Sequence, residues 1–261
     1  MAARTRSGAA RSETAIVLAL TALLTIVPLV PLVVAAPLAV AILALTVLAW
    51  RRRAPSATSL GVLAAACVSL AVVGVGPQQV VFPLAFAVYA VVVHRVPWLH
   101  GVAAWFRRGA LNGGLLVFAA GIAAISGAAL LAWYEIVRPD LQDLVRTFVP
   151  IIPIWLLVPG ALIFAPVNAS IEEAAYRGVV LAALDVALGP GVAAIVLQAM
   201  AFGALHVHGF PRGAVGVGLA CLYGLALGAL RRRAGGLLAP WIAHVLTDLV
   251  IASIVLAIAH R

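Results

Sequence analysis

The sequence predicts an all-α protein, a polytopic transmembrane bundle of about eight to ten membrane helices. Hydrophobic residues make up 65% of its 261 residues, charged residues only 10%, and the mean hydropathy is strongly positive. In soluble domains about a quarter of the residues are charged, so this chain has too few charged residues to cover the surface of a water-facing globule. The long apolar runs also lack the strict alternation of half-buried strands. Helices that cross a lipid bilayer satisfy all three observations.

The first apolar run, from Thr14 to Trp50, is about twice as long as one spanning helix. Pro28, Pro31 and Pro37 interrupt it, so we expect two short helices joined by a tight turn. The run is too long for the apolar core of a signal peptide, and we treat it as uncleaved. Further spans are predicted at 57–76, 79–96, 110–134, 148–165, 170–188, 191–207, 213–230 and 236–259.

The positive charge of the chain points to membrane orientation and not to nucleic acid. The net charge is +9, yet there is no lysine. The arginines gather in short clusters beside apolar runs, at Arg51–Arg53, Arg107–Arg108 and Arg231–Arg233. Such clusters anchor helix ends on the cytoplasmic side of a membrane. We therefore expect the lipid bilayer as a partner and no nucleic acid.

The arginines also predict an orientation. If the N-terminus is cytoplasmic and ten helices cross, that side carries twelve arginines and the other side five. The five are Arg138, Arg146, Arg231, Arg232 and Arg233. We predict an integral protein of a bacterial-type plasma membrane with a cytoplasmic N-terminus, in which the triple arginine lies on the disfavoured side.

The stretch ASIEEAAYRG, residues 169–178, places scarce charged residues between apolar segments. Charged side chains are costly inside a membrane and are functional candidates there. Glu173 and Arg177 are four residues apart, share a helix face and are expected to form a structural ion pair. Glu172 points about 100° away from Glu173 on a helix. Glu172 is thus left to face a polar cavity as a candidate general base.

Two later helices supply the other candidates. Phe202 and His206 are four residues apart, and so are His244 and Asp248. Together with Glu172, these side chains could activate a water molecule and stabilise an oxyanion, or hold a divalent metal ion such as zinc. Their spacing does not choose between the two. The pair Glu172–Glu173 is not the H-E-x-x-H helix of many zinc proteases, which weakens the zinc alternative.

These three motifs, E-E-x-x-x-R, F-x-x-x-H and H-x-x-x-D, resemble those of the CAAX protease and bacteriocin-processing (CPBP) family. This family of intramembrane endopeptidases includes the type II CAAX prenyl endopeptidase. The stretches APVNASIEEAAYRG, AMAFGALHVHGF and GALRRRAGGLLAPWIAH are similar to the family core. The resemblance covers residues 148–259. We therefore predict N-terminal membrane helices without a recognised motif in 1–147 and a catalytic helix core in 148–261.

The resemblance implies a glutamate-dependent protease that acts on a membrane-anchored protein or peptide. Glu172 and His206 would activate water, and His244 and Asp248 would stabilise the oxyanion. Descriptions of the family as metalloproteases leave a metal at Glu172, His206, His244 and Asp248 as an alternative. Asp248 stands where prenyl-processing members have asparagine, and an aspartate donates a hydrogen bond only when protonated. Asp248 could instead orient His244 or accept a proton.

Two other classes of function remain open from the sequence. A non-enzymatic membrane protein could use the same fold as a scaffold or as an immunity factor against a peptide toxin. A proton-coupled transporter would also use buried Glu and His, but the chain lacks the repeated halves typical of transporters. The intramembrane endopeptidase is the leading prediction.

Overall fold

The computed structural model describes residues 2–76, 78–142 and 153–259. Over these ranges the chain is helical and contains no strand. Eight helices in this part of the chain are long and apolar enough to cross a membrane. A shorter apolar helix occupies Val192–Val207. The predicted all-α, polytopic bundle is therefore confirmed.

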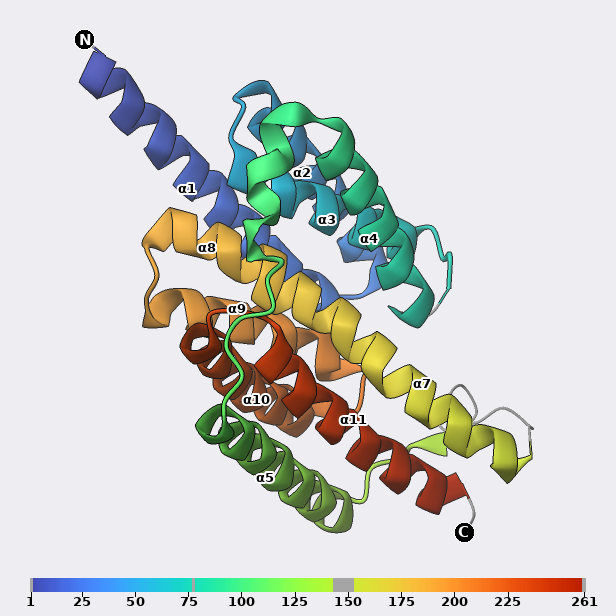
Figure 1. Cartoon of the computed structure of the whole chain (residues 1–261). Helices are drawn as coiled ribbons and strands as arrows, with labels where there is room; N and C mark the ends of the chain where they lie inside the picture. Colours follow the sequence, from blue (N-terminus) through green and yellow to red (C-terminus); the bar gives the residue numbers. More distant parts are fainter. Residues whose placement is uncertain (1, 77, 143–152, 260–261) are drawn as a thin grey trace.

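The N-terminal helices pack together on one side of the molecule (Figure 1). They are α1 (Ala2–Ile26), the 3₁₀ turn η1 (Val27–Leu29), α2 (Leu32–Arg51), α3 (Pro55–Val72), α4 (Gln78–Arg95) and the 3₁₀ segment η2 (Pro97–Trp105). The break between α1 and α2 falls at Pro28 and Pro31, as predicted, because proline cannot donate the backbone hydrogen bond that continues a helix. Pro37 was also expected to interrupt the run, but it lies inside α2, close to the start of that helix. Helix α3 lies at the centre of this group and contacts α1, α2 and α4.

The remaining helices form the other side of the bundle (Figure 1). They are α5 (Gly113–Val137), α7 (Ile154–Glu172), the π-helical segment η3 (Glu173–Val180), α8 (Leu181–Leu188), α9 (Val192–Ala204), the 3₁₀ turn η4 (Leu205–Val207), α10 (Gly213–Ala234) and α11 (Leu238–Ala259). Helix α11 packs against α5, α7 and α10, and α10 packs against α9. These contacts bring the three motif-bearing segments together.

One predicted boundary is wrong. The spans expected at 148–165 and 170–188 are a single apolar element, since α7, η3 and α8 follow one another without a break from Trp155 to Leu188. The polar residues at the junction of the two predicted spans stay in the helix because α11 satisfies them. Trp241 on α11 donates to Ser170 Oγ at 2.9 Å, and Asn168 donates to Asp248 at 3.0 Å. A helix that is continuous through polar residues therefore carries the ASIEEAAYRG stretch into the interior.

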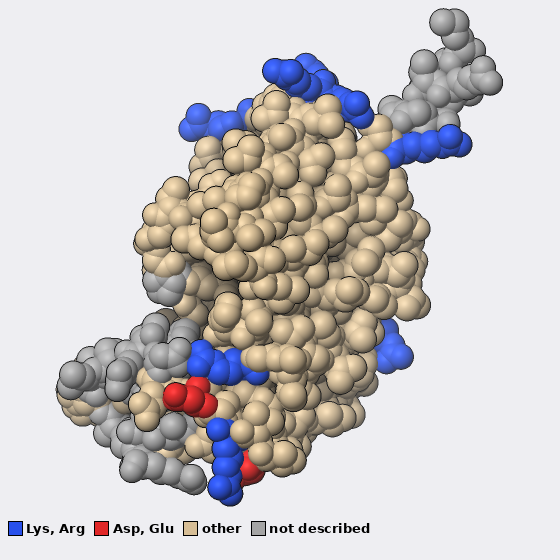
Figure 2. Space-filling view, turned by 180° about the vertical axis from the view of Figure 1, so that it is seen from behind, with Lys and Arg blue, Asp and Glu red and all other residues tan. Residues whose placement is uncertain are grey.

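This continuity also corrects the predicted distribution of arginines. Leu237 N–H donates to the Arg107 carbonyl at 2.9 Å, and Ala110 N–H donates to the Ala234 carbonyl at 2.7 Å. These bonds place Arg231–Arg233 at the same end as Arg107 and Arg108, and not on the opposite side. Figure 2 shows charged side chains gathered toward opposite ends of the molecule, with a broad uncharged surface between them.

The other end of the bundle carries Arg212, whose guanidinium donates to the Asp140 carbonyl at 2.8 Å. Arg177 belongs to neither end because it is buried in the interior. Merging two predicted spans into one reverses the side of every later loop. This explains why Arg212 and Arg231–Arg233 each lie on the side opposite to the predicted one. The revised distribution favours a cytoplasmic arginine-rich end, and the cytoplasmic N-terminus stays a prediction.

Small residues allow α9 and α10 to approach closely. A Cβ atom at Gly203 on α9 would meet the Val217 carbonyl oxygen at 2.9 Å and the Cys221 amide nitrogen at 3.0 Å, both on α10. Backbone atoms cannot move aside as a flexible side chain can. In a bilayer the hydrophobic effect does not hold helices together, so close backbone packing of this kind supplies the attraction between them.

We therefore expect Gly203→Ala to destabilise the protein although alanine favours helix formation. Overpacking of about 1–3 kcal/mol should lower the Tm by several degrees. Thermal unfolding in detergent measures this. The control is Gly218→Ala on α10, where a new Cβ meets no atom within 4 Å. Equal Tm values for the two variants would contradict this account of the interface.

Candidate active site

The predicted ion pair between Glu173 and Arg177 is present. Arg177 Nη1 donates to Glu173 Oε1 at 2.9 Å, and each residue is only 1% exposed. The Arg177 guanidinium also lies 4.3 Å from the centre of the Phe202 ring, which adds a cation–π contact. The pair thus ties the π-helical segment η3 to α9.

Glu173 has a second partner that sequence spacing did not indicate. Its Oε1 lies 2.8 Å from Nδ1 of His244 on α11. A carboxylate held ionised by arginine can only accept, so Nδ1 carries the proton and donates. Glu173 therefore orients the His244 ring in addition to pairing with Arg177.

His244 Nε2 faces two further carboxylates. It lies 3.5 Å from Glu172 Oε2 and 3.6 Å from Asp248 Oδ1. The expectation that Glu172 and Glu173 serve different surroundings is only partly met, because both reach the same imidazole on its two nitrogens. This is possible because the helix changes from α to π geometry at Glu173 and the ring lies between the two side chains.

Asp248 is held by an asparagine from α7. Asn168 Nδ2 donates to Asp248 Oδ2 at 3.0 Å. Oδ2 therefore accepts a hydrogen bond from Asn168, while Oδ1 faces His244 Nε2 at an ion-pair distance. Sequence reasoning did not select Asn168. The available signal was its position four residues before Glu172, on the same helix face.

His206 ends α9 in the 3₁₀ turn η4. Its Nδ1 lies 3.1 Å from the Phe202 carbonyl oxygen. Because a carbonyl only accepts, Nδ1 is the donor and Nε2 is left with a free lone pair. The Phe202 ring packs 4.9 Å from the His206 ring and 6.1 Å from the His244 ring, between centroids. The Phe202 ring is therefore a neighbour of both imidazoles.

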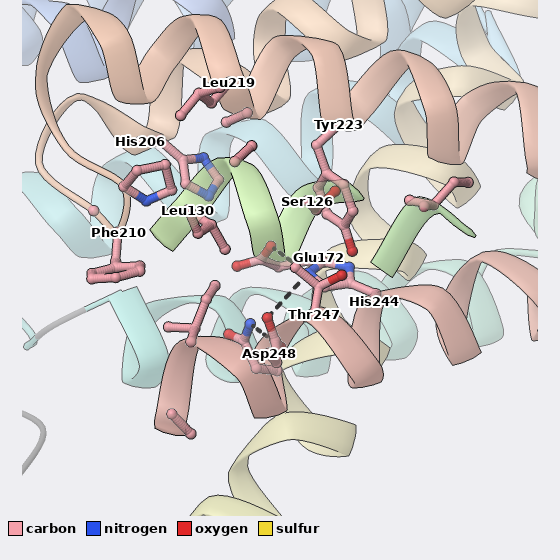
Figure 3. A pocket seen from close by; sticks show the side chains of 18 of the residues that line it. Ser126, Leu130, Glu172, His206, Phe210, Leu219, Tyr223, His244, Thr247 and Asp248 are labelled. Atoms are coloured by element: carbon pink, nitrogen blue, oxygen red, sulfur yellow. Dashed lines mark hydrogen bonds and ion pairs between the residues drawn. The ribbon is translucent and has the colours of Figure 1, made fainter. Parts of the chain in front are cut away.

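All four predicted catalytic residues line one cavity of about 1290 Å³. Figure 3 shows Glu172, His244 and Asp248 grouped on one side of it, with His206 on another side and Tyr223 and Thr247 nearby. The remaining walls are mainly apolar side chains of α5, α7, α10 and α11. The structure thus brings the three motifs to a single chamber.

The donor set does not fit a metal ion in this arrangement. Among the described residues, no three His, Cys, Asp or Glu side chains are grouped to hold one. His244 uses Nδ1 for Glu173, and its Nε2 lies 3.5 Å from Glu172 Oε2 and 3.6 Å from Asp248 Oδ1. We derive no catalytic step through a metal.

Comparison with known proteins shows a similarity between the motif-bearing segment and one protein family. Residues 152–250 match the sequence model of a family described as Type II CAAX prenyl endopeptidase Rce1-like. The matched segment contains all three motifs, from Glu172 to Asp248. This match shows that residues 152–250 are similar to that family. No curated protein and no solved structure matches the chain.

The predicted resemblance to the CPBP family is confirmed as a similarity over residues 152–250. The family is one of endopeptidases, and the match therefore indicates a peptidase. The eight apolar helices make the protein an integral membrane protein. The match leaves α1–α5 outside it, and the division at residue 147 stays a prediction.

The buried Glu173–Arg177 pair should contribute to the stability of the fold. Arg177→Met should destabilise the protein by roughly 3–5 kcal/mol, because it leaves the buried Glu173 without its strongest compensating charge. Thermal unfolding in detergent checks this. The control is Arg233→Met, which removes an exposed arginine whose guanidinium lies over the Phe118 ring. A fall in Tm no larger than that of the control would contradict the role given to Arg177.

Proposed function

We propose that this protein is an intramembrane endopeptidase that hydrolyses a peptide bond of a membrane-associated protein or peptide. The observation that carries the proposal is the meeting of Glu172, His206 and His244 from three different helical segments at one cavity. The family match supports the class of reaction. Its mechanism follows from the chemistry available at each side chain.

In the first step, a water molecule between Glu172 and His206 would attack the carbonyl carbon of the substrate. Glu172 would accept one proton from this water as the general base. The free Nε2 lone pair of His206 would accept a hydrogen bond from the same water and orient it. The new C–O bond forms while the carbonyl π electrons move to oxygen, which becomes an oxyanion.

In the second step, the oxyanion would be stabilised by the N–H of His244 Nε2. Glu173 supports this role, because it accepts from Nδ1 and thereby favours an imidazolium with a proton on each nitrogen. The C–N bond then breaks, and the proton held by Glu172 passes to the leaving nitrogen. The products are a new carboxylate terminus and a new amine terminus.

The cavity walls suit an apolar substrate segment. Val117 and Ile125 on α5 and Phe164 on α7 line the cavity and are also substantially exposed on the surface of the bundle. A membrane-anchored tail could therefore enter from the bilayer while its scissile bond approaches the polar residues. Lipid-modified proteins, peptide precursors and proteins with a C-terminal sorting helix all meet this description.

Glu172→Gln tests the proposal directly. The variant keeps the shape of the side chain and removes the base, so activity should fall by roughly 10²–10⁴-fold. The assay uses the full chain in liposomes with a fluorogenic peptide that carries an S-prenylated cysteine near its C-terminus. An unprenylated peptide and a transmembrane peptide with the same cleavage sequence complete the panel.

The matched control is Glu135→Gln, which changes an exposed glutamate at the end of α5. It should cleave as the unmodified protein does. The proposal fails if the unmodified protein cleaves none of the three peptides, or if Glu172→Gln cleaves as fast as the control. Retained activity in a His206→Ala variant would remove His206 from the mechanism.

Chelation provides a second test. Because the carboxylates and imidazoles are not grouped to hold a metal ion, prolonged dialysis against EDTA or 1,10-phenanthroline should leave the cleavage rate unchanged. Elemental analysis of the dialysed protein serves as the control for complete removal. Loss of activity that zinc restores would overturn the metal-independent mechanism and favour metal-assisted attack.

A further inference from the structure

The presence of aspartate at position 248 leaves the oxyanion with one donor fewer than an asparagine would supply. Oδ2 of Asp248 accepts a hydrogen bond from Asn168 at 3.0 Å, and Oδ1 faces His244 Nε2 at 3.6 Å, an ion-pair distance. An ionised carboxylate cannot donate a hydrogen bond. Its charge would also repel a developing oxyanion. A second donor must therefore come from elsewhere in the cavity if the oxyanion is to be held by more than His244.

Tyr223 on α10 is a candidate that the three motifs do not include. Its side chain lines the same cavity as Glu172, His244 and Asp248. The Tyr223 and His244 rings meet edge to face, with centroids 5.5 Å apart, and the Phe202 ring lies 6.3 Å from Tyr223. Figure 3 shows the Tyr223 side chain extending from α10 toward His244 and Thr247. These two rings fix the direction of the phenol.

The hydroxyl group of Tyr223 is buried and makes no well-formed hydrogen bond among the described residues, although the Thr247 hydroxyl lies close to it. Nearby Thr247 already donates its own hydroxyl proton to the Ala243 carbonyl at 3.0 Å. A buried hydroxyl without a well-formed hydrogen bond costs free energy that a purely structural tyrosine could avoid as phenylalanine. Its position beside the polar residues of the cavity indicates that the hydroxyl serves a bound molecule.

We infer that Tyr223 is a further catalytic residue, whose hydroxyl donates a hydrogen bond to the oxyanion in place of the amide that Asp248 lacks. This rests on the proposed peptidase function. A neutral phenol suits this role because it keeps the O–H proton that it donates and brings no charge of its own into the cavity. Asp248, held by Asn168, lies 3.6 Å from His244 Nε2 and stabilises the positive charge of the imidazolium. His244 Nε2 and Tyr223 supply the two donors.

The test is Tyr223→Phe, which keeps the ring packing and removes only the hydroxyl. In the liposome assay with the fluorogenic prenylated peptide, kcat should fall by roughly 10²–10³-fold with little change in KM, as for the loss of one oxyanion donor. The Tm should not fall. Tyr134→Phe on α5 is the matched control, since this half-buried tyrosine does not line the cavity.

A second variant separates donation from packing. Asp248→Asn restores an amide donor, so the double variant Tyr223→Phe, Asp248→Asn should recover kcat by on the order of tenfold over Tyr223→Phe alone. Wild-type kcat in Tyr223→Phe, or no recovery in the double variant, overturns the inference. An inactive Glu172→Gln beside a fully active Tyr223→Phe would refute the role of Tyr223 and leave the proposed function standing.

Discussion

The carboxylate of Glu173 is the interaction on which the rest of the site depends. It is buried inside a membrane bundle, where an isolated charge is very costly. Arg177 compensates it from four residues along the same helix, and His244 compensates it from α11. One oxygen atom thus joins the π-helical segment to the last helix of the chain. Removing Arg177 would leave the charge of Glu173 without its arginine partner, and removing Glu173 would leave the His244 imidazole without a fixed orientation.

The long element from α7 to α8 turns that local pairing into a site. A break near Ser170, which the polar residues suggested, would have left Glu172 and Glu173 at a membrane surface. The continuous helix instead carries them into the interior, where α11 provides Asp248, His244 and Trp241 as partners for its polar face. A π-helical segment at this point alters the angular spacing of side chains and allows adjacent glutamates to reach one ring.

Asp248 changes how the cavity can stabilise negative charge. With asparagine, the same position would both accept and donate; with aspartate it accepts, and Asn168 satisfies the oxygen that does not face His244. The result is a cluster rich in carboxylates around a single imidazole, which favours a protonated His244. A neutral donor on a separate helix is the simplest complement to such a cluster, and Tyr223 is in position to be one.

The sequence by itself determined the helical membrane fold, the break at Pro28 and Pro31, the Glu173–Arg177 pair and the choice of Glu172, His206, His244 and Asp248. These features depend on composition or on residues within one turn of a helix, where backbone geometry sets which side chains meet. Only the tertiary structure decided that two predicted spans are one helix, that Arg231–Arg233 lie beside Arg107, and that Asn168 and Tyr223 face the cavity. Contacts such as Glu173 with His244 join positions 71 residues apart. Helix packing sets those contacts, and no local periodicity encodes it.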